Sequence, residues 1–212
     1  MTDDLKQIVG SGYDAAADEF SVWQRGIVGS RRLERLDELL ALLPEQPDVL
    51  ELGVGAGVGS TRTLAERGRL TGVDISAEQV RRARERVPGA TFLHGDIAGL
   101  EFGDSSFDAV VAFYVFNHLP HNDLRVLIPR VFAWLRPRGL FLATYGVSEA
   151  HESIQEDWLG VPMFFSSLGA DETRSLLRAA GFELIVDEVE TIEEPEPDRG
   201  TGRFLWLLAR KP

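Results

Sequence analysis

From Asp48 onward, short apolar stretches alternate with longer segments in which apolar residues recur every three or four positions. The short stretches predict buried strands and the longer segments predict amphipathic helices. A regular strand–helix alternation is typical of parallel βαβ units. The pattern predicts strands at 48–53, 69–74, 90–94, 107–113, 138–144, 182–189 and 203–210, and helices at 57–67, 76–86, 122–135 and 171–180.

The connection between the last two predicted strands is short. Its sequence, TIEEPEPDRGTG, leaves no room for the crossover helix that two parallel strands would need. These two strands are therefore predicted to pair antiparallel. The resulting fold class is α/β, with a Rossmann-like, doubly wound, seven-stranded sheet that is mostly parallel and ends in an antiparallel C-terminal hairpin.

Two further segments complete a single predicted domain over residues 1–212. Residues 1–47 have the apolar spacing of amphipathic helices and are expected to form an N-terminal helical cap. The connection 148–170 is unusually long for a compact domain. It carries Trp158, Met163 and Phe164, and so many large apolar groups are unfavourable in water. We expect this insertion to fold over the mouth of the functional site and cover a substrate.

The stretch from Val49 to Asp74 carries the strongest chemical signal. Glycines alternate with other residues from Gly53 to Gly59, between a predicted strand and a predicted helix. Glycine adopts positive φ freely and lets a ligand approach bare main chain. Asp74 ends the next strand, at the spacing where an acid in such units accepts hydrogen bonds from a ribose. The sequence therefore predicts a bound nucleoside.

Two common classes of nucleotide site do not fit this stretch. A dinucleotide fingerprint, G-x-G-x-x-G/A, would place its last position on Val58 or Ser60, depending on the frame. A phosphate-binding loop needs a Gly-Lys-Ser/Thr ending, and no lysine lies between Lys6 and Lys211. A nicotinamide-dependent oxidoreductase nevertheless remains an alternative enzyme, and a non-catalytic nucleoside-binding relative of the fold is a second alternative.

The order Glu51-Leu52-Gly53-x-Gly55-x-Gly57 resembles motif I of class I S-adenosylmethionine-dependent methyltransferases. This resemblance implies that S-adenosyl-L-methionine is the cofactor. It also implies that Glu51 and the main chain of the three glycines meet the methionine and ribose end. Asp74 resembles the acid that binds the ribose in this family.

The resemblance extends beyond the glycine stretch. Asp96 resembles the acid after the third strand that meets the adenine amino group, and the segment GYDAAADEF around Tyr13 resembles the N-terminal segment that lies over the cofactor. Further cofactor contacts are expected at Ile75, Ile97 and Phe113. The segment FYVFNHLPHND, residues 113–123, resembles the region that lines the pocket of small-molecule methyltransferases.

His118, within that segment, is the candidate catalytic residue, because a neutral imidazole can take a proton from an acceptor near pH 7. His118 is also a candidate substrate contact, together with Tyr145, Trp158, Met163 and Phe164. Their aromatic and apolar character favours an apolar or aromatic acceptor. The expected reaction is methyl transfer to an oxygen or nitrogen of a small metabolite.

Composition and charge narrow the expected partners. The net charge of −12 opposes binding to a phosphate backbone, so no nucleic acid partner is expected. The chain has no cysteine, and its four histidines form no zinc-type ligand pair, so no metal is expected. The longest apolar run is too short to span a membrane. An acidic N-terminus without a secretion signal favours a cytoplasmic protein, either a monomer or a homodimer.

Overall fold

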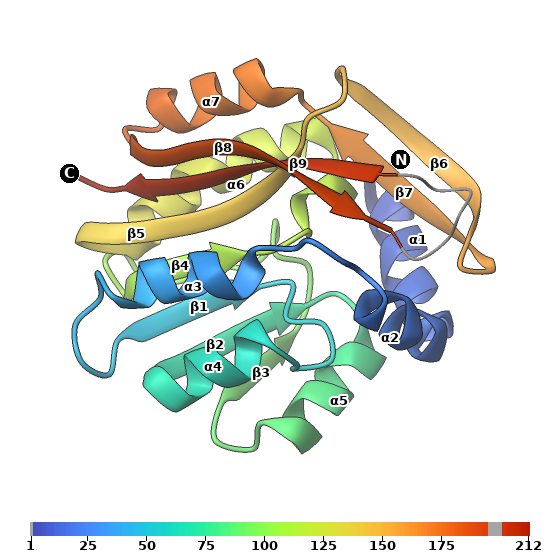
Figure 1. Ribbon diagram of the computed structural model, residues 1–212, viewed down its shortest axis with the longest axis horizontal. Helices are drawn as coiled ribbons and strands as arrows, with labels where there is room; N and C mark the ends of the chain where they lie inside the picture. The colour runs from blue at the N-terminus through green and yellow to red at the C-terminus, as the bar shows by residue number, and fades with distance from the viewer. Residues whose placement is uncertain (1, 195–200) are drawn as a thin grey trace.

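The computed structural model describes residues 2–194 and 201–212. In this part of the chain a seven-stranded sheet has the strand order β3-β2-β1-β4-β5-β9-β8 (Figure 1). Its strands are β1 (Asp48–Leu52), β2 (Arg69–Asp74), β3 (Thr91–His94), β4 (Phe107–Ala112), β5 (Leu135–Gly146), β8 (Glu183–Glu193) and β9 (Thr201–Arg210). The strands β1 to β5 pair in parallel, whereas β9 pairs antiparallel with both β5 and β8. The predicted fold class is confirmed.

Helices cover both faces of this sheet (Figure 1). One face packs against α3 (Arg32–Leu40), α4 (Ser60–Arg67) and α5 (Ala77–Arg86), and the other against α6 (His121–Trp134) and α7 (Ala170–Ala179). Central strands are therefore apolar on both sides, as in other doubly covered parallel sheets. In β1, for example, Val49 faces the α3 side and Leu50 the α6 side, and both are fully buried.

The first part of the N-terminal region contains two helices. It forms α1 (Thr2–Ala15) and α2 (Ala17–Arg25), with a break at Ala16. Asp14 fastens the end of α1 to the start of α5, because its carboxylate accepts hydrogen bonds from Ser76 Oγ at 2.6 Å and from the Glu78 N–H at 3.0 Å. Ser76 in turn caps α5 by accepting from the Gln79 N–H.

The long insertion is a β-hairpin, which the sequence pattern does not predict. Strands β6 (His151–Trp158) and β7 (Val161–Ser167) form a separate two-stranded sheet that lies beside α1 (Figure 1). Leu159 and Gly160 form its turn, and both have positive φ, 53° and 85°. Such turns normally carry Asn-Gly or Asp-Gly, so Leu-Gly gives a weak hairpin signal.

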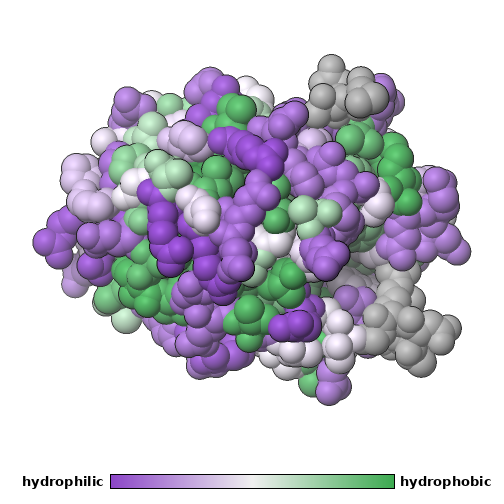
Figure 2. All heavy atoms as spheres, turned by 90° about the horizontal axis from the view of Figure 1, so that it is seen from above, coloured by the Kyte–Doolittle hydropathy of each residue, from purple (hydrophilic) through white to green (hydrophobic). Residues whose placement is uncertain are grey.

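The surface is mainly hydrophilic on the face drawn in Figure 2, where apolar side chains form small, separate groups. Within residues 2–194 and 201–212, none of the helices combines the length and the apolar character needed to cross a membrane. The same residues include no cluster of three or more histidine, cysteine or acidic side chains arranged to hold a metal ion.

Candidate cofactor and acceptor site

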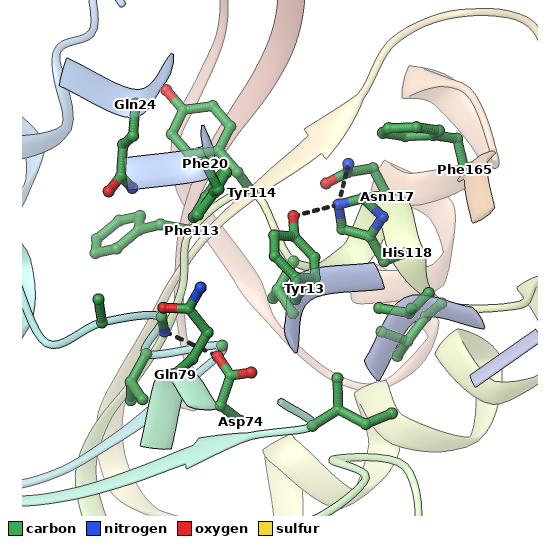
Figure 3. Close-up of a pocket in the computed structure, with 18 of the residues that line it drawn as sticks. Tyr13, Phe20, Gln24, Asp74, Gln79, Phe113, Tyr114, Asn117, His118 and Phe165 are labelled. Carbon is green, nitrogen blue, oxygen red and sulfur yellow. Dashed lines mark hydrogen bonds between the residues drawn. The ribbon is translucent and has the colours of Figure 1, made fainter. Parts of the chain in front are cut away.

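A cavity of about 480 Å³ lies at the carboxyl ends of β1, β2, β3 and β4, beneath α1, α2 and the β6–β7 hairpin (Figure 3). Ligands of open α/β sheets bind at this edge, where the strand order reverses. Every residue predicted to contact the cofactor lines this cavity except Gly57. The lining members of that set are Tyr13, Glu51, Gly53, Gly55, Asp74, Ile75, Asp96, Ile97 and Phe113.

Gly57 does not line the cavity, and its surroundings indicate a role in packing. Its φ is +70°, and a Cβ at this position would lie 2.8 Å from the Cα of Ala83 in α5. Glycine is therefore needed here so that α5 can pack closely against the loop. The glycine pattern alone could not separate this packing requirement from a ligand requirement.

Gly55 differs from Gly57 in its surroundings. Its φ is +55°, and a Cβ built on it would meet no atom within 4 Å among the described residues. Because Gly55 also lines the cavity, that space belongs to the cavity. At Gly53 a Cβ would lie 2.7 Å from the Cβ of Val115, which holds the start of the loop close to the segment after β4.

Asp74 organises the glycine loop from the end of β2. One carboxylate oxygen accepts a hydrogen bond from the Gly55 N–H at 2.8 Å (Figure 3). The other accepts from the Ser76 N–H at 2.9 Å. Burial raises the pKa of Asp74, and these two main-chain donors oppose the shift. A carboxylate has about four lone-pair sites. Asp74 can therefore hold the loop and still accept hydrogen bonds from a ligand in the cavity.

Glu51 is a buried carboxyl group with unused hydrogen-bonding capacity. It is 2% exposed, and Oε1 accepts a hydrogen bond from Ser60 Oγ at 3.1 Å. Oε2 has no partner within the described residues. Burial raises the pKa of Glu51 to about 7, and the hydrogen bond from Ser60 opposes the shift. An orphaned buried oxygen facing a cavity indicates a position where a ligand donor would be stabilised.

Arg32 supplies an unpaired positive charge at the same cavity, and the sequence analysis did not select it. Its guanidinium lies 4.7 Å from the ring centroid of Tyr114 and 5.6 Å from that of Phe113. It has no hydrogen bond or ion pair from its guanidinium to the part of the chain that the structure describes. Burial lowers its pKa, and electrostatic interactions with Tyr114, Glu51 and Glu190 oppose the shift. No sequence motif marks this arginine, since only the fold brings the start of α3 to the cavity.

The conformation of Tyr114 helps to build this charged end. Tyr114 has φ +57°, a left-handed conformation that costs a residue with a side chain about 1–3 kcal/mol. Its N–H donates to Thr144 Oγ1 at 2.6 Å, and its hydroxyl lies 3.1 Å from Ser30 Oγ. These contacts hold the ring beside Arg32, where cation–π attraction favours the guanidinium.

The opposite end of the cavity contains Asp96 and Ile97, which follow β3. Asp96 Oδ1 accepts a hydrogen bond from the Ala98 N–H at 2.9 Å, and Oδ2 lies 2.7 Å from Lys6 Nζ. Lys6 Nζ also lies 2.9 Å from Asp123 Oδ2. Lys6 therefore ties α1 to both sides of this end of the cavity. It was not predicted from the sequence, because a lone lysine in an N-terminal helix carries no local signal.

His118 belongs to the short helix η1 (Phe116–His118) and lines the cavity. Nδ1 lies 2.8 Å from the Phe164 carbonyl oxygen, which can only accept, so Nδ1 carries the proton. Nε2 therefore has the lone pair, and it accepts from Tyr13 Oη at 2.9 Å and from Asn117 Nδ2 at 3.1 Å (Figure 3). Burial lowers the pKa of His118 to about 4. The imidazole is neutral at pH 7.

The other predicted substrate contacts divide into two groups. Trp158 lines the cavity, with its ring 5.3 Å from that of Tyr13. Tyr145, Met163 and Phe164, which were predicted with it, do not line the cavity. Tyr145 packs in the core beside Phe116, and the other two pack beneath α1.

Phe165, the residue after Phe164, lines the cavity instead. Successive side chains of a strand point to opposite faces, and the register of this hairpin could not be predicted from the sequence. The aromatic residues of the insertion were therefore identified as a group but not individually.

Comparison with known proteins supports the interpretation that this geometry suggests. Residues 49–139 match the model of a family described as a methyltransferase domain. A protein of Mycolicibacterium smegmatis, named a probable S-adenosylmethionine-dependent methyltransferase, is 34% identical over 154 residues, which cover 73% of this chain and 59% of that relative. Together with the seven-stranded sheet, these similarities support a class I S-adenosylmethionine-dependent methyltransferase.

Two further similar proteins have methyltransferase names. The 27-O-demethylrifamycin SV methyltransferase of Amycolatopsis mediterranei is 29% identical over 98% of this chain and 85% of its own length. The solved structure of the Burkholderia thailandensis 1,6-didemethyltoxoflavin-N1-methyltransferase, with bound 1,6-didemethyltoxoflavin and S-adenosylhomocysteine, has a TM-score of 0.61 at 23% identity. It covers 96% of this chain and 90% of its own. S-adenosylmethionine is the cofactor of the family.

Proposed function

We propose that this protein transfers the methyl group of S-adenosylmethionine to an oxygen or nitrogen atom of a small apolar or aromatic metabolite. The observation that carries the proposal is a pair of unlike charges at one end of the cavity. Glu51 has an orphaned carboxylate oxygen there, and Arg32 has an unpaired guanidinium. Together they complement the ammonium and carboxylate of an amino acid, which S-adenosylmethionine carries at its methionine end.

The rest of the cavity fits the remaining parts of the cofactor. The open space at Gly55 would admit the chain that joins the sulfur to the ribose. Asp74 would accept hydrogen bonds from the ribose hydroxyls, and Asp96 from the adenine amino group, while Ile75 and Ile97 would pack against the adenosine. In this arrangement each of the two acids has lone pairs beyond those used within the protein.

Bound S-adenosylmethionine would supply a methyl group that its sulfonium charge already activates. The protein then has to hold the acceptor in line with the methyl carbon and exclude water. Phe20, Trp158 and Phe165 are aromatic walls of the cavity that suit an apolar or aromatic acceptor. The names of two relatives, one an O-demethylrifamycin methyltransferase and one an N1-methyltransferase, are consistent with either acceptor atom.

The direct test is methyl transfer from radiolabelled S-adenosylmethionine to a panel of phenols, alcohols and heteroaromatic amines. The proposal expects labelled product from at least one aromatic acceptor. Full occupancy by cofactor with no transfer to any acceptor would favour a non-catalytic relative of the fold. Binding of NAD(P) in preference to S-adenosylhomocysteine would favour the oxidoreductase alternative.

Arg32→Met is expected to weaken binding of S-adenosylhomocysteine by roughly 10- to 100-fold, because hydrogen bonds to a charged group contribute about 1.5–3 kcal/mol. The same variant should bind 5′-methylthioadenosine, which lacks the amino acid portion, as tightly as the wild type does. Calorimetric titration with both ligands measures the difference.

Arg31→Met is the matched control for this prediction. Arg31 precedes Arg32 in sequence but pairs with Glu34 and Glu188 instead of lining the cavity. We expect it to leave both affinities unchanged. Equal losses for the two ligands in Arg32→Met would contradict the assignment of Arg32 to the carboxylate.

The affinity for S-adenosylhomocysteine is also expected to depend on pH through Glu51. Burial raises the pKa of this carboxyl group to about 7 in the free protein. An ammonium group beside it would favour the ionised form and lower the pKa again, so binding below pH 7 should release a proton. The affinity should therefore fall by about tenfold between pH 8 and pH 6.

Calorimetry in buffers of different ionisation enthalpy measures the proton release at pH 6.5. Glu51→Gln cannot titrate, so its affinity should be constant over this range and its binding should release no proton. Proton release that persists in Glu51→Gln would assign the titration to another group.

A further inference from the structure

The hydrogen bonds around His118 form one continuous chain. It runs from Tyr13 Oη through the imidazole to the main-chain oxygen of Phe164, with distances of 2.9 Å and 2.8 Å (Figure 3). The Phe164 carbonyl fixes the proton on Nδ1, so the Tyr13 hydroxyl must donate to Nε2. Asn117 donates to the same nitrogen. Both donors cover the lone pair of Nε2, which therefore has no direct access to a ligand.

The atoms that remain available at this point of the cavity are hydrogen-bond acceptors. Tyr13 Oη uses its proton on His118 and keeps two lone pairs. Asn117 Oδ1 is buried and has no partner within the described part of the chain. Both residues line the cavity. A ligand that satisfies these oxygens must bring hydrogen atoms of its own.

We propose that the methyl acceptor binds with its nucleophilic oxygen or nitrogen still protonated, and that Tyr13 is the catalytic residue that receives this proton and passes its own to His118. This inference rests on the function proposed above, and it names the acceptor as a hydroxyl or N–H compound. A thioether, a tertiary amine or an ionised carboxylate lacks the required hydrogen.

The proposed step balances in atoms and charge. The acceptor atom forms a bond to the methyl carbon while the bond from that carbon to sulfur breaks, and the sulfur keeps the electron pair as a neutral thioether. The acceptor proton moves to Tyr13 Oη, and the Tyr13 proton moves to His118 Nε2. The positive charge of the sulfonium is replaced by that of the imidazolium, whose Nδ1–H still donates to Phe164.

His118 is a weak base in this setting, since burial lowers its pKa to about 4. A weak base is sufficient here, because the acceptor hydroxyl becomes strongly acidic as its bond to carbon forms. Burial also raises the pKa of Tyr13 well above its ordinary value. A free phenolate is therefore unfavourable, so the two proton transfers occur together.

The β6–β7 hairpin contributes to this arrangement through its main chain. Phe164 belongs to β7, and its carbonyl oxygen determines which imidazole nitrogen carries the proton. Contact between the hairpin and η1 thus sets the tautomer of His118. The side chain of Phe164, predicted as a substrate contact, is not needed for this role.

The proton transfer from the acceptor through Tyr13 to His118, called the relay below, is tested by the kinetics of three variants. They are Tyr13→Phe, His118→Gln and the double variant. Glutamine can still accept a hydrogen bond from Tyr13 but cannot take up its proton. We expect each single variant to lower kcat by about 100-fold, as loss of general base catalysis does. The double variant should lose no more, and the Kd for S-adenosylhomocysteine should change less than threefold.

Tyr145→Phe removes the hydroxyl of a buried tyrosine outside the cavity, and it should leave kcat unchanged. Activity of His118→Gln within threefold of the wild type would overturn the relay and leave His118 with a positioning role. Multiplicative losses in the double variant would also overturn it, because they would show that the two residues act independently.

A second readout does not depend on turnover. Phenol and anisole are titrated into protein loaded with S-adenosylhomocysteine while the ¹⁵N signals of the His118 ring are followed by NMR. Phenol should bind about fivefold more tightly than anisole, as one hydrogen bond allows, and only phenol should shift the Nε2 signal. Tyr13→Phe should abolish both differences.

Equal binding of phenol and anisole to the wild type would overturn the inference, whatever the acceptor panel shows. A panel without any methylated product, together with the phenol preference, would contradict the proposed function and leave the assignment of Tyr13 as the proton-accepting contact in place.

Discussion

Replacing Gly55 with leucine should weaken binding of S-adenosylhomocysteine by at least about 1000-fold, which corresponds to about 4 kcal/mol. A side chain at Gly55 would extend into space that is open in the cavity, where the cofactor is expected to lie against bare main chain. Leucine would also have to adopt the φ of +55° found at Gly55, and this left-handed conformation costs a residue with a side chain about 1–2 kcal/mol. Calorimetry measures the affinity, and circular dichroism verifies that the variant is folded.

Gly59→Leu is a close control for this variant. Gly59 has φ +58°, and a Cβ there would also meet nothing within 4 Å among the described residues. Its ψ of −110° lies outside the left-handed helical region, so leucine should cost at least as much in backbone conformation there, but Gly59 does not line the cavity. Its affinity should remain within about threefold of the wild type. If both variants lost binding equally, the loss would reflect backbone strain and not occlusion of the cofactor.

Asp74→Ala should lower both the affinity for S-adenosylhomocysteine and the stability of the free protein. The carboxylate is the expected acceptor for the ribose hydroxyls, and losing such a charged acceptor costs about 1–3 kcal/mol of binding free energy. It also satisfies the main-chain N–H groups of Gly55 and Ser76. Leaving these donors unpaired should cost a further 1–3 kcal/mol or so of unfolding free energy, about the penalty of an unsatisfied buried group.

Calorimetry and urea denaturation separate the two effects of Asp74→Ala. An unchanged Kd would contradict the ribose assignment even if the protein were less stable. An unchanged midpoint of unfolding would show that the hydrogen bonds to Gly55 and Ser76 contribute little to the fold. The affinity is therefore measured at a temperature well below the midpoint of the variant.

The central sheet could be predicted because its signals are local. Strands such as 69–74 and 107–113 match β2 and β4 to within one residue, since each concentrates apolar residues, at Leu70 and Val73 in the first and over 109–113 in the second. The short C-terminal connection likewise dictated an antiparallel pair. By contrast, β6 and β7 were not predicted, because the aromatic residues of β7 cluster and the turn has Leu-Gly in place of a stronger turn sequence.

The parts of the candidate site that depend on main-chain conformation could be predicted from the sequence, whereas the parts that depend on tertiary packing could not. Gly55 and Asp74 mark a loop geometry, which a short sequence can specify. Arg32 and Lys6 reach the cavity only through the packing of α3 and α1. The residues near them in sequence give no signal of this position. At Gly57 the glycine is required by the close approach of Ala83. A bound ligand would require glycine in the same way, so the sequence does not distinguish the two causes.

The most direct test of the account is a crystal structure of the complex with S-adenosylhomocysteine. We predict that the amino acid portion of the ligand contacts Glu51 and Arg32, that the ribose contacts Asp74, and that the sulfur faces the side of the cavity where Tyr13 lies. A ligand bound outside this cavity, or bound with its amino acid portion at Asp96, would contradict the account.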